Sequence, residues 1–594
     1  MGGIILFYYN IRQIIMSYPN ISDPEFSEKI TNKLIRYKIP KKKRTFNQIC
    51  FSKEFELQLP QISLAQYINP KTPYKGLLVF HKIGSGKTCT AINIAEQWKH
   101  VSNIIVVVPA SLIGNFRGEL RSKCAKNAYI TDNEREKLKN LHPVSKEYNE
   151  IIAKSDARIN KYYSIYSYHK FVEDVENDEV NFKNSILIID EIQNMVSEGG
   201  KFYKTLYNAI HTAPKEMRII LLSATPMFDK PIEIALTLNL LRLPFDLPIG
   251  KEFEKMFIKL LQNRTTGEYK YTTKNMDIFK ERIKGYISFY QGSPDYVFPK
   301  ATIKYVRCEM SDFQYQSYVS VLKKEEKELN LSRKEIVRSF TVGEILDLPN
   351  NFFIGTRLIS NVAFPNKNVG KKGFDSFRGK HLQLENLEEY SVKFHKIITR
   401  INKSSGPVFV YSNFKEYGGL KSFAEALEYN GYSDYTMTGE GRRRYAIMSG
   451  DASKQLKDEI KNVYNQIANV NGSQLKVLLL SPTAKEGISL LAVRQIHILE
   501  PYWNASRIMQ VIGRGIRTCS HKNLPEEKRS VQVYIYISVH QNERETIDEY
   551  IAKMAQKKSH LINEFENALK EIAIDCELNK NANETEFEKL QCDK

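Results

Sequence analysis

The sequence predicts an α/β protein with two parallel-sheet domains, a mainly helical segment between them, and a C-terminal helix. Short aliphatic runs alternate with helical patterns from about residue 51 to 243, and again from about 391 to 540. Continuous aliphatic runs are typical of parallel strands that are covered on both faces. From residue 546 onward, apolar residues recur at helical spacing and define one face of a long helix.

The aliphatic runs place the strands. In the first α/β region we expect strands at 77–80, 104–108, 186–189 and 219–222. In the second we expect them at 408–411, 447–448, 477–480, 497–499 and 531–537. We expect no aliphatic strands between residues 244 and 390, because long charged stretches in this segment indicate helix. The predicted domains are an N-terminal extension (1–50), a first α/β domain (51–243), a helical insertion or linker (244–390), a second α/β domain (391–540) and a helical tail (541–594).

Composition limits the class of protein. A chain of 594 residues is too long for one hydrophobic core, and its apolar content of 42% is typical of a globular protein. We expect no membrane span and no membrane partner, because no run of about 18 apolar residues occurs. The seven cysteines are scattered, and no pair has metal-ligand spacing. This pattern favours a reducing compartment and no structural zinc.

The net charge is strongly positive, at +19. Such an excess favours a polyanionic partner, most often nucleic acid, although a generally basic surface is the alternative interpretation. The basic run at 41–44 has the composition of a nuclear localisation patch, but it equally fits a solvated face or a phosphate contact.

A glycine-rich loop follows the first predicted strand. Residues 81–88 read His-Lys-Ile-Gly-Ser-Gly-Lys-Thr. A buried strand that ends in such a loop is typical of a phosphate-binding site, although a glycine turn without a ligand is the alternative. Lys87 can reach the β- and γ-phosphates, and the hydroxyl of Thr88 can bind Mg²⁺. The residues assigned to the nucleotide here are His81, Lys82, Ile83, Gly84, Ser85, Gly86, Lys87 and Thr88.

Two acids follow the strand predicted at 186–189. Asp190 is placed to bind Mg²⁺, directly or through water, and Glu191 is placed to polarise an attacking water. An acidic pair after a strand is common by itself. It gains weight here because it follows the glycine-rich loop with strands on both sides.

Small hydroxyl residues end the next strand. Ser223 and Thr225 can sense a γ-phosphate and pass on its presence, although an ordinary exit from a strand is the alternative. In the second α/β region, the loop 481–489 contains Gly487 and several hydroxyls. This loop suits contacts to a nucleic-acid backbone and to the edge of a nucleotide, or it is a plain surface loop.

An arginine pair lies near the end of the second region. Residues 508–517 are predicted as helix, so that Arg514 and Arg517 project from one face. Two guanidinium groups on one face can stabilise a γ-phosphate, and arginine fingers of this kind raise hydrolysis rates by roughly 10³–10⁵. A phosphate contact to DNA or a surface ion pair is the alternative.

These five elements, in this order, resemble the motifs of superfamily 2 helicases and translocases. The resemblance implies two RecA-like domains with ATP between them. It also assigns roles by position: Gly84, Gly86, Lys87 and Thr88 for ATP, Asp190 and Glu191 for metal and water, Ser223 and Thr225 for coupling, Gln510, Arg514 and Arg517 for the γ-phosphate, and Gln61 near adenine.

A closer resemblance rests on longer segments. The run that ends at His81 and the segments 285–290 and 411–420 are similar to the poxvirus early transcription factor small subunit. Segments 500–504 and 546–549 look like poxvirus nucleoside triphosphatase I. Similar proteins occur in other large cytoplasmic DNA viruses and on yeast cytoplasmic linear plasmids. The acidic motif here ends in Ile-Gln rather than in Ala-His or Cys-His.

The resemblance implies a nucleic-acid-dependent ATPase that uses ATP and Mg²⁺ and moves on DNA in preference to RNA. It implies a role in transcription by a virus- or plasmid-encoded RNA polymerase, with that polymerase and a capping enzyme as partners. The implied location is the cytoplasm, and the nucleus is the alternative. The alternative function is an initiation or termination factor subunit that uses hydrolysis as a release switch without unwinding.

Overall fold

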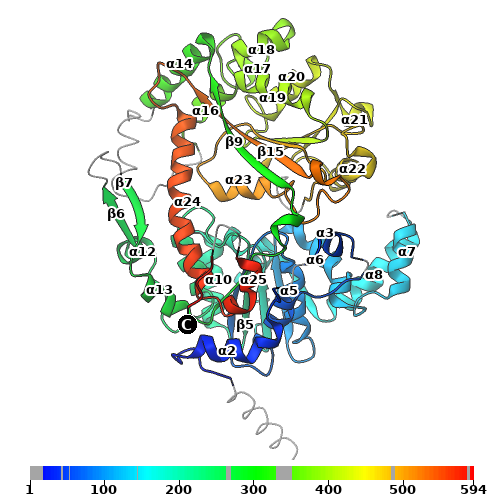
Figure 1. The fold of residues 1–594 in the computed structure, drawn as a ribbon, viewed down its shortest axis with the longest axis vertical. Coiled ribbons are helices and arrows are strands. Elements are labelled where there is room, and N and C mark those ends of the chain that lie inside the picture. The colour runs from blue at the N-terminus through cyan, green and yellow to red at the C-terminus, as the bar shows by residue number, and fades with distance from the viewer. Residues whose placement is uncertain are drawn as a thin grey trace, which may run out of the picture. The chain divides into compact units, whose positions relative to one another are not determined.

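The computed structural model describes residues 18–41, 44–52, 54–142, 145–262, 269–328, 351–482, 488–584 and 589–593. The chain forms two compact units: a first unit of Met1–Pro294 with His560–Lys594, and a second unit of Asp295–Ser559. Each unit contains one parallel sheet with helices around it (Figure 1). The predicted fold class of two parallel-sheet domains is confirmed.

The sheet of the first unit has six parallel strands in the order β3-β2-β4-β5-β1-β8. The four strands predicted in this region are all present, and their central residues are fully buried. The bounds are β1 (Gly76–His81), β2 (Asn103–Val108), β3 (Tyr163–Ser167), β4 (Ser185–Ile189), β5 (Arg218–Ser223) and β8 (Ile287–Tyr290).

The helices of the first unit pack their apolar residues against this sheet. Helix α2 buries Phe26, Ile30 and Leu34 in the same core cluster as β1. The N-terminal region is therefore part of the core from Phe26 onward. The helices of this unit are α2 (Phe26–Leu34), α3 (Phe46–Cys50), α4 (Leu59–Tyr67), α5 (Lys87–Glu96), α6 (Ile113–Leu120), α7 (Asp132–Asn140), α8 (Lys146–Asn160), α9 (Tyr168–Glu176), α10 (Lys201–Thr212), α11 (Ile232–Asn239), α12 (Gly250–Phe257), α13 (Met276–Ile283) and α25 (Cys576–Asn583).

The sheet of the second unit has seven parallel strands in the order β11-β12-β13-β10-β14-β15-β9. All five strands predicted here are present. The bounds are β9 (Lys300–Glu309), β10 (Val408–Tyr411), β11 (Ser433–Asp434), β12 (Arg444–Met448), β13 (Val477–Leu480), β14 (Gln495–Ile498) and β15 (Ser530–Val539).

In the second unit, α14 to α19 follow one another between β9 and β10, and helices are interspersed with strands after β10. Their bounds are α14 (Asp312–Glu328), α16 (Ile354–Asn361), α17 (Lys371–Phe374), α18 (Leu384–Tyr390), α19 (Val392–Lys403), α20 (Leu420–Tyr429), α21 (Tyr435–Thr438), α22 (Lys454–Asn465) and α23 (Ala505–Ile512). The predicted C-terminal helix is α24 (Ile547–Glu571), and the boundary between the two units falls within it.

The expectation that strands are absent from 244–390 is wrong. Strand β8 joins the first sheet beside β1, and β9 pairs with β15 over ten residues. Strands β6 (Ile258–Gln262) and β7 (Tyr269–Thr273) form a separate antiparallel pair. Strand β9 escaped detection because it is an edge strand with mostly exposed side chains, so its sequence lacks a continuous aliphatic run.

The structure contains disulfides that the scattered cysteine pattern did not reveal. Disulfides join Cys89 to Cys124 and Cys576 to Cys592, with Cα–Cα distances of 5.7 and 5.8 Å. Cys308 is a buried free thiol. The partners are 35 and 16 residues apart, so their spacing gave no local signal, and only folding brings each pair together.

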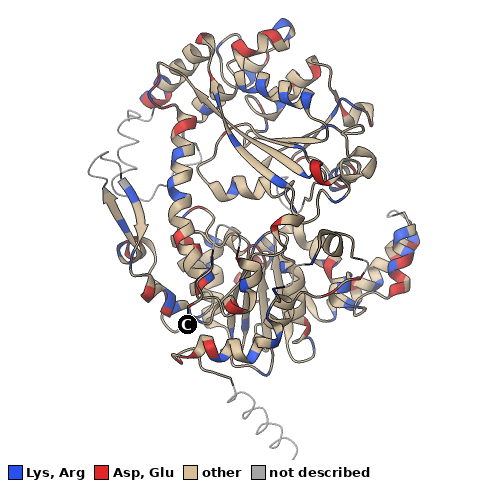
Figure 2. Ribbon diagram, viewed as in Figure 1, with Lys and Arg blue, Asp and Glu red and all other residues tan. Residues whose placement is uncertain are grey.

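Basic and acidic residues alternate along the surface helices. Figure 2 shows both signs interspersed on α7, α8 and α24. Exposed pairs such as Lys139–Glu136 contribute little to stability because water and salt screen them. Among the described helices, none is both long enough and apolar enough to span a membrane.

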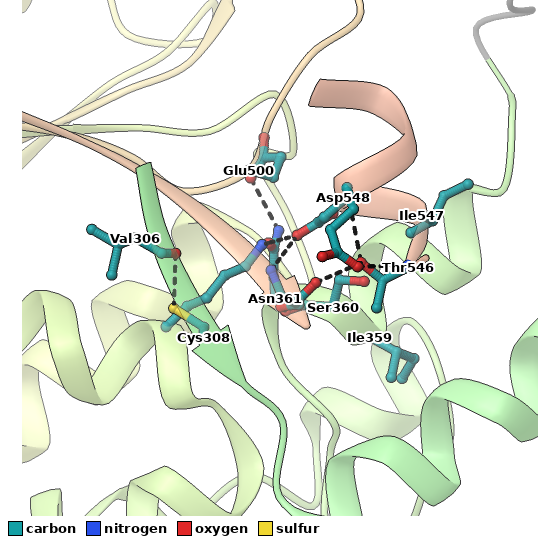
Figure 3. Close-up of polar contacts among 12 residues, drawn as sticks. Val306, Cys308, Ile359, Ser360, Asn361, Glu500, Thr546, Ile547 and Asp548 are labelled. Atoms are coloured by element: carbon teal, nitrogen blue, oxygen red, sulfur yellow. Dashed lines mark hydrogen bonds and ion pairs between the residues drawn. The ribbon is translucent and has the colours of Figure 1, made fainter. Parts of the chain in front are cut away.

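A charged network lies inside the second unit (Figure 3). Lys393 on α19 is fully buried, and its ammonium contacts Asp548 at 2.7 Å and the Asn361 side-chain oxygen at 3.0 Å. The Asn361 amide donates to Glu500, which also accepts a hydrogen bond from Ser412. The network therefore joins α16, α19, the start of α24 and the ends of two strands. Burial makes each charge dependent on its partners.

We expect Lys393→Met to destabilise the second unit by about 3–5 kcal/mol, because Asp548 would keep a buried charge without its cation. Urea unfolding can be followed through Trp503 in a Trp98→Phe background, since the chain has two tryptophans. The control is Lys403→Met on the same helix, where the side chain is exposed. Lys393→Met with Asp548→Leu should recover much of the loss. Equal midpoints for Lys393→Met and the control would contradict the role of the pair.

Candidate nucleotide site

The glycine-rich loop lies directly after β1, as predicted. Gly84 and Gly86 have φ values of +82° and +81°, in the left-handed region that favours glycine. Gly86 is the N-cap of α5, so the backbone N–H groups that begin at Lys87 face the loop. Ser85 is buried, and within the described residues its hydroxyl has no hydrogen-bond partner. A helix N-terminus behind a glycine loop with a lysine is suited to a polyphosphate.

Gln61 on α4 lies against the loop. Its side-chain amide donates to the Gly86 carbonyl at 3.2 Å, and its side-chain oxygen accepts from the Gln58 N–H at 2.8 Å. A Cβ at Gly86 would lie only 2.7 Å from the Gln61 amide nitrogen and would displace this side chain, and the φ of +81° strains any other residue at this position. Gln61 therefore supports the loop, and its contact with adenine stays a prediction.

The acidic pair follows β4, which is buried in the same sheet. Asp190 is 6% exposed, and burial raises its pKa to about 7, with the neighbouring Glu191 carboxylate as a second cause and Lys87 acting in the opposite direction. Glu191 has φ +50°, and its N–H donates to the Asp190 carboxylate at 2.9 Å. The hydroxyl of Tyr168 donates to the Asp190 and Glu191 carbonyls at 2.6 and 3.0 Å. Tyr168 is a supporting residue that the sequence did not reveal.

A bridge connects the acidic pair to the next strand. The Gln193 amide donates to the Glu191 carboxylate at 2.6 Å, and the Ser223 hydroxyl donates to the Gln193 side-chain oxygen at 2.7 Å. Ser223 also accepts a hydrogen bond from the Thr225 N–H at 3.0 Å. The departure from the expected Ala-His or Cys-His ending thus supplies the link between the acids and the predicted coupling residues.

Thr88 and Asp190 were predicted as Mg²⁺ ligands. Both offer oxygen, which is the donor that Mg²⁺ prefers. The raised pKa of Asp190 arises from burial and from an adjacent carboxylate, so a divalent cation would favour its charged form. The donor set therefore fits Mg²⁺.

The predicted helix that carries the arginines is shorter than expected. Helix α23 ends at Ile512, and the backbone turns at Gly513. Arg514 donates its N–H to the Val511 carbonyl, and Arg517 donates from Nε to the Gly513 carbonyl at 3.2 Å. The expectation that both arginines share one helix face is wrong, because the glycines at 513 and 515 favour turns. Gln510 remains on α23, and Gly487 lies outside the described residues.

The structure thus collects one group of predicted residues in the first unit. These are Gln61, His81, Lys82, Ile83, Gly84, Ser85, Gly86, Lys87, Thr88, Asp190, Glu191, Ser223 and Thr225. Gln510, Arg514 and Arg517 belong to the second unit. Ser412, which directly follows β10 in the second unit, is buried and donates to Glu500 at 2.9 Å.

Comparison with known proteins identifies both halves. Residues 42–350 match the SNF2-related domain, and residues 392–519 match the helicase conserved C-terminal domain. The chain is 51% identical to "Putative ATP-dependent RNA helicase R563" of Acanthamoeba polyphaga mimivirus, over 97% of this chain and 99% of that protein.

Two further relatives are more distant. The chain is 28% identical to "Putative ATP-dependent RNA helicase R350" of the same virus, over 92% of this chain and 77% of that protein. It is also 28% identical to "Termination factor NPH-I homolog" of African swine fever virus (isolate Warthog/Namibia/Wart80/1980), over 85% of this chain and 77% of that protein. With a phosphate loop, an acidic pair and both matching domains, the chain belongs to the SNF2-related family of superfamily 2 helicases of large DNA viruses, and it is a helicase-type ATPase.

Proposed function

We propose that this ATPase moves along nucleic acid, with DNA preferred to RNA, during transcription by a virus- or plasmid-encoded RNA polymerase in the cytoplasm. The observation that supports the chemistry best is that Lys87 follows β1 while Asp190 and Glu191 follow β4, two strands of one parallel sheet with only β5 between them. These residues supply a cation for phosphate and two acids for metal and water.

The first unit binds the triphosphate. Backbone N–H groups at the start of α5 face its oxygens, and Lys87 offsets the charge on the β- and γ-phosphates. Thr88 and Asp190 would hold Mg²⁺, which would offset the negative charge of the phosphates. The motif resemblance assigns the γ-phosphate to Gln510, Arg514 and Arg517, and the proposal retains this assignment.

Glu191 positions the attacking water in this proposal. Gln193 fixes the Glu191 carboxylate through one hydrogen bond and reaches Ser223 through a second. A change at the γ-phosphate that moves Glu191 is therefore transmitted to the loop after β5. Gln193 is accordingly a positioning residue that acts through Glu191.

The nucleic-acid part of the proposal is supported by the net charge of +19 and by the relatives. The mimivirus relative is named an RNA helicase, and the African swine fever virus relative is named a termination factor. Phosphate contacts dominate binding of this kind and make it sensitive to salt. The proposed partners beyond nucleic acid are the polymerase and a capping enzyme.

A second candidate function is a transcription factor subunit that hydrolyses ATP as a release switch without unwinding. The name of the African swine fever virus relative favours it. Both candidates share the same nucleotide chemistry. They differ in whether hydrolysis separates the strands of a duplex.

Lys87→Ala and Glu191→Gln should each abolish ATP hydrolysis while leaving the fold intact. The first removes the cation that faces the phosphates, and the second removes the charge that polarises water. Phosphate release measures activity, and circular dichroism checks the fold. Lys71→Ala, at an exposed position before β1, is the control. Wild-type turnover in either folded variant would refute the assignment of the site.

Gln193→Leu should lower kcat about 10- to 100-fold with little change in KM for ATP. A hydrogen bond to a charged group contributes about 1.5–3 kcal/mol, and each 1.4 kcal/mol corresponds to a factor of about ten. Gln97→Leu, at the exposed end of α5, is the matched control. If kcat equals that of the control, the bridge has no part in hydrolysis.

DNA should stimulate hydrolysis more than RNA of matched sequence and length, and added salt should reduce the stimulation. ATP turnover is measured with single-stranded DNA, double-stranded DNA, RNA and no nucleic acid. Equal rates under all four conditions would contradict the proposal that the protein moves along nucleic acid. A forked duplex then tests strand separation. Strand displacement would contradict a release switch without unwinding, whereas hydrolysis without displacement would contradict unwinding and would fit translocation alone or a release switch.

A further inference from the structure

The C-terminal tail of the chain is built into the nucleotide unit. The Ile574 N–H donates to the Ile287 carbonyl at 2.9 Å, and the side chains of Asn579 and Asn583 donate to the Phe289 carbonyl at 3.1 and 3.2 Å. Strand β8 in turn pairs with β1, with Val79 opposite Ser288 and His81 opposite Tyr290. The tail therefore lies one strand away from the glycine-rich loop.

Three buried side chains connect the glycine-rich loop to the C-terminal tail through hydrogen bonds. His81 contacts the Ser288 hydroxyl at 2.9 Å through Nε2, and Ser288 donates to the Asp575 carboxylate at 2.7 Å. All three side chains are fully buried. His81 is the first residue of the glycine-rich loop, and Asp575 is the N-cap residue of α25. The loop is thus tied to the tail across almost 500 residues of sequence.

The other hydrogen bonds of Asp575 determine which groups donate and which accept in the relay formed by His81, Ser288 and Asp575. Asp575 accepts from Ser288, from the Phe289 N–H at 3.0 Å and from the Asn579 amide at 2.9 Å, which leaves the carboxylate as an acceptor only. Burial raises the pKa of Asp575 to about 6 and lowers the pKa of His81 to about 3, with Lys87 as the second cause for His81. His81 is therefore neutral, and its proton is on Nε2 and points to Ser288.

A second contact joins the same two parts. The Lys82 ammonium lies 2.9 Å from the Glu566 carboxylate on α24, with exposed side-chain fractions of 29% and 12%. The Lys82 N–H also donates to the Tyr290 carbonyl at 3.0 Å, and Ser85 donates its N–H to the Lys82 carbonyl. Of two consecutive loop residues, Lys82 thus contacts an acid of the C-terminal tail directly, and His81 is connected to one through Ser288.

We propose that Asp575, acting through Ser288 and His81, and Glu566, acting through Lys82, are positioning residues for ATP, so that the C-terminal tail completes the phosphate-binding loop. This inference rests on the proposed nucleotide site. The tail fixes where the backbone N–H groups of the loop point. It does not hold the attacking water, because Glu191 lies on a different strand and is fixed by Gln193.

Ser288→Ala tests the relay selectively, because Asp575 keeps its hydrogen bonds from Phe289 and Asn579. We expect KM for ATP and the dissociation constant of a fluorescent ATP analogue to rise about tenfold, with kcat within about twofold of wild type. Asp575→Ala should act in the same direction. The double variant should be no worse than the stronger single variant, because both changes break one chain of contacts.

Glu577→Ala is the control, because Glu577 is a half-buried residue of α25 that takes no part in the contacts to β8, and it should leave KM unchanged. An unchanged KM in folded Ser288→Ala overturns the proposal, and so do additive effects in the double variant. If Asp575→Ala does not fold, Ser288→Ala decides alone. Failure of this inference is distinct from failure of the proposed function, because the wild-type protein would still hydrolyse ATP and Lys87→Ala would still be inactive.

Discussion

The pairing of β1 with β5 on one side and β8 on the other is the constraint on which the rest of the nucleotide site depends. In this register Phe80 lies opposite Ser223, and His81 lies opposite Tyr290. Since all strands of the sheet are parallel, their carboxyl ends meet at one edge. The phosphate loop, the acidic pair and Ser223 are therefore neighbours although more than a hundred residues separate the first from the last.

Polar side chains at this edge are held by hydrogen bonds to one another. Gln193 connects Glu191 with Ser223, and Ser288 connects His81 with Asp575. In a buried setting each such group costs free energy if it loses its partner, so every member of a chain restricts the next. The second unit uses the same principle at Lys393 and Asp548. Both units thus combine an apolar sheet with a few fully buried polar connections.

Sequence patterns identified most of the sheet and the chemistry of the site. All nine predicted strands are present. They could be recognised because parallel strands that are buried on both faces have continuous aliphatic sequences. Strands β3, β6, β7, β8, β9 and β11 were not predicted. Of these, β8 is short, and β9 lies at an edge with mostly exposed side chains. The helix predicted through Arg517 ends at Ile512, where glycine competes with helix formation.

What the sequence determined by itself was local: the glycine loop that ends in Lys87 and Thr88, the acids after a strand, and the two-domain α/β pattern. Each loop and strand signal is contained in a few consecutive residues, and the two-domain pattern is the repetition of such local signals along the chain. Only the tertiary structure decided that Gln193 bridges two strands, that Cys89 pairs with Cys124, and that Asp575 reaches His81. Contacts of this kind join residues far apart in the chain, and their geometry exists only after the sheet has fixed the strands side by side.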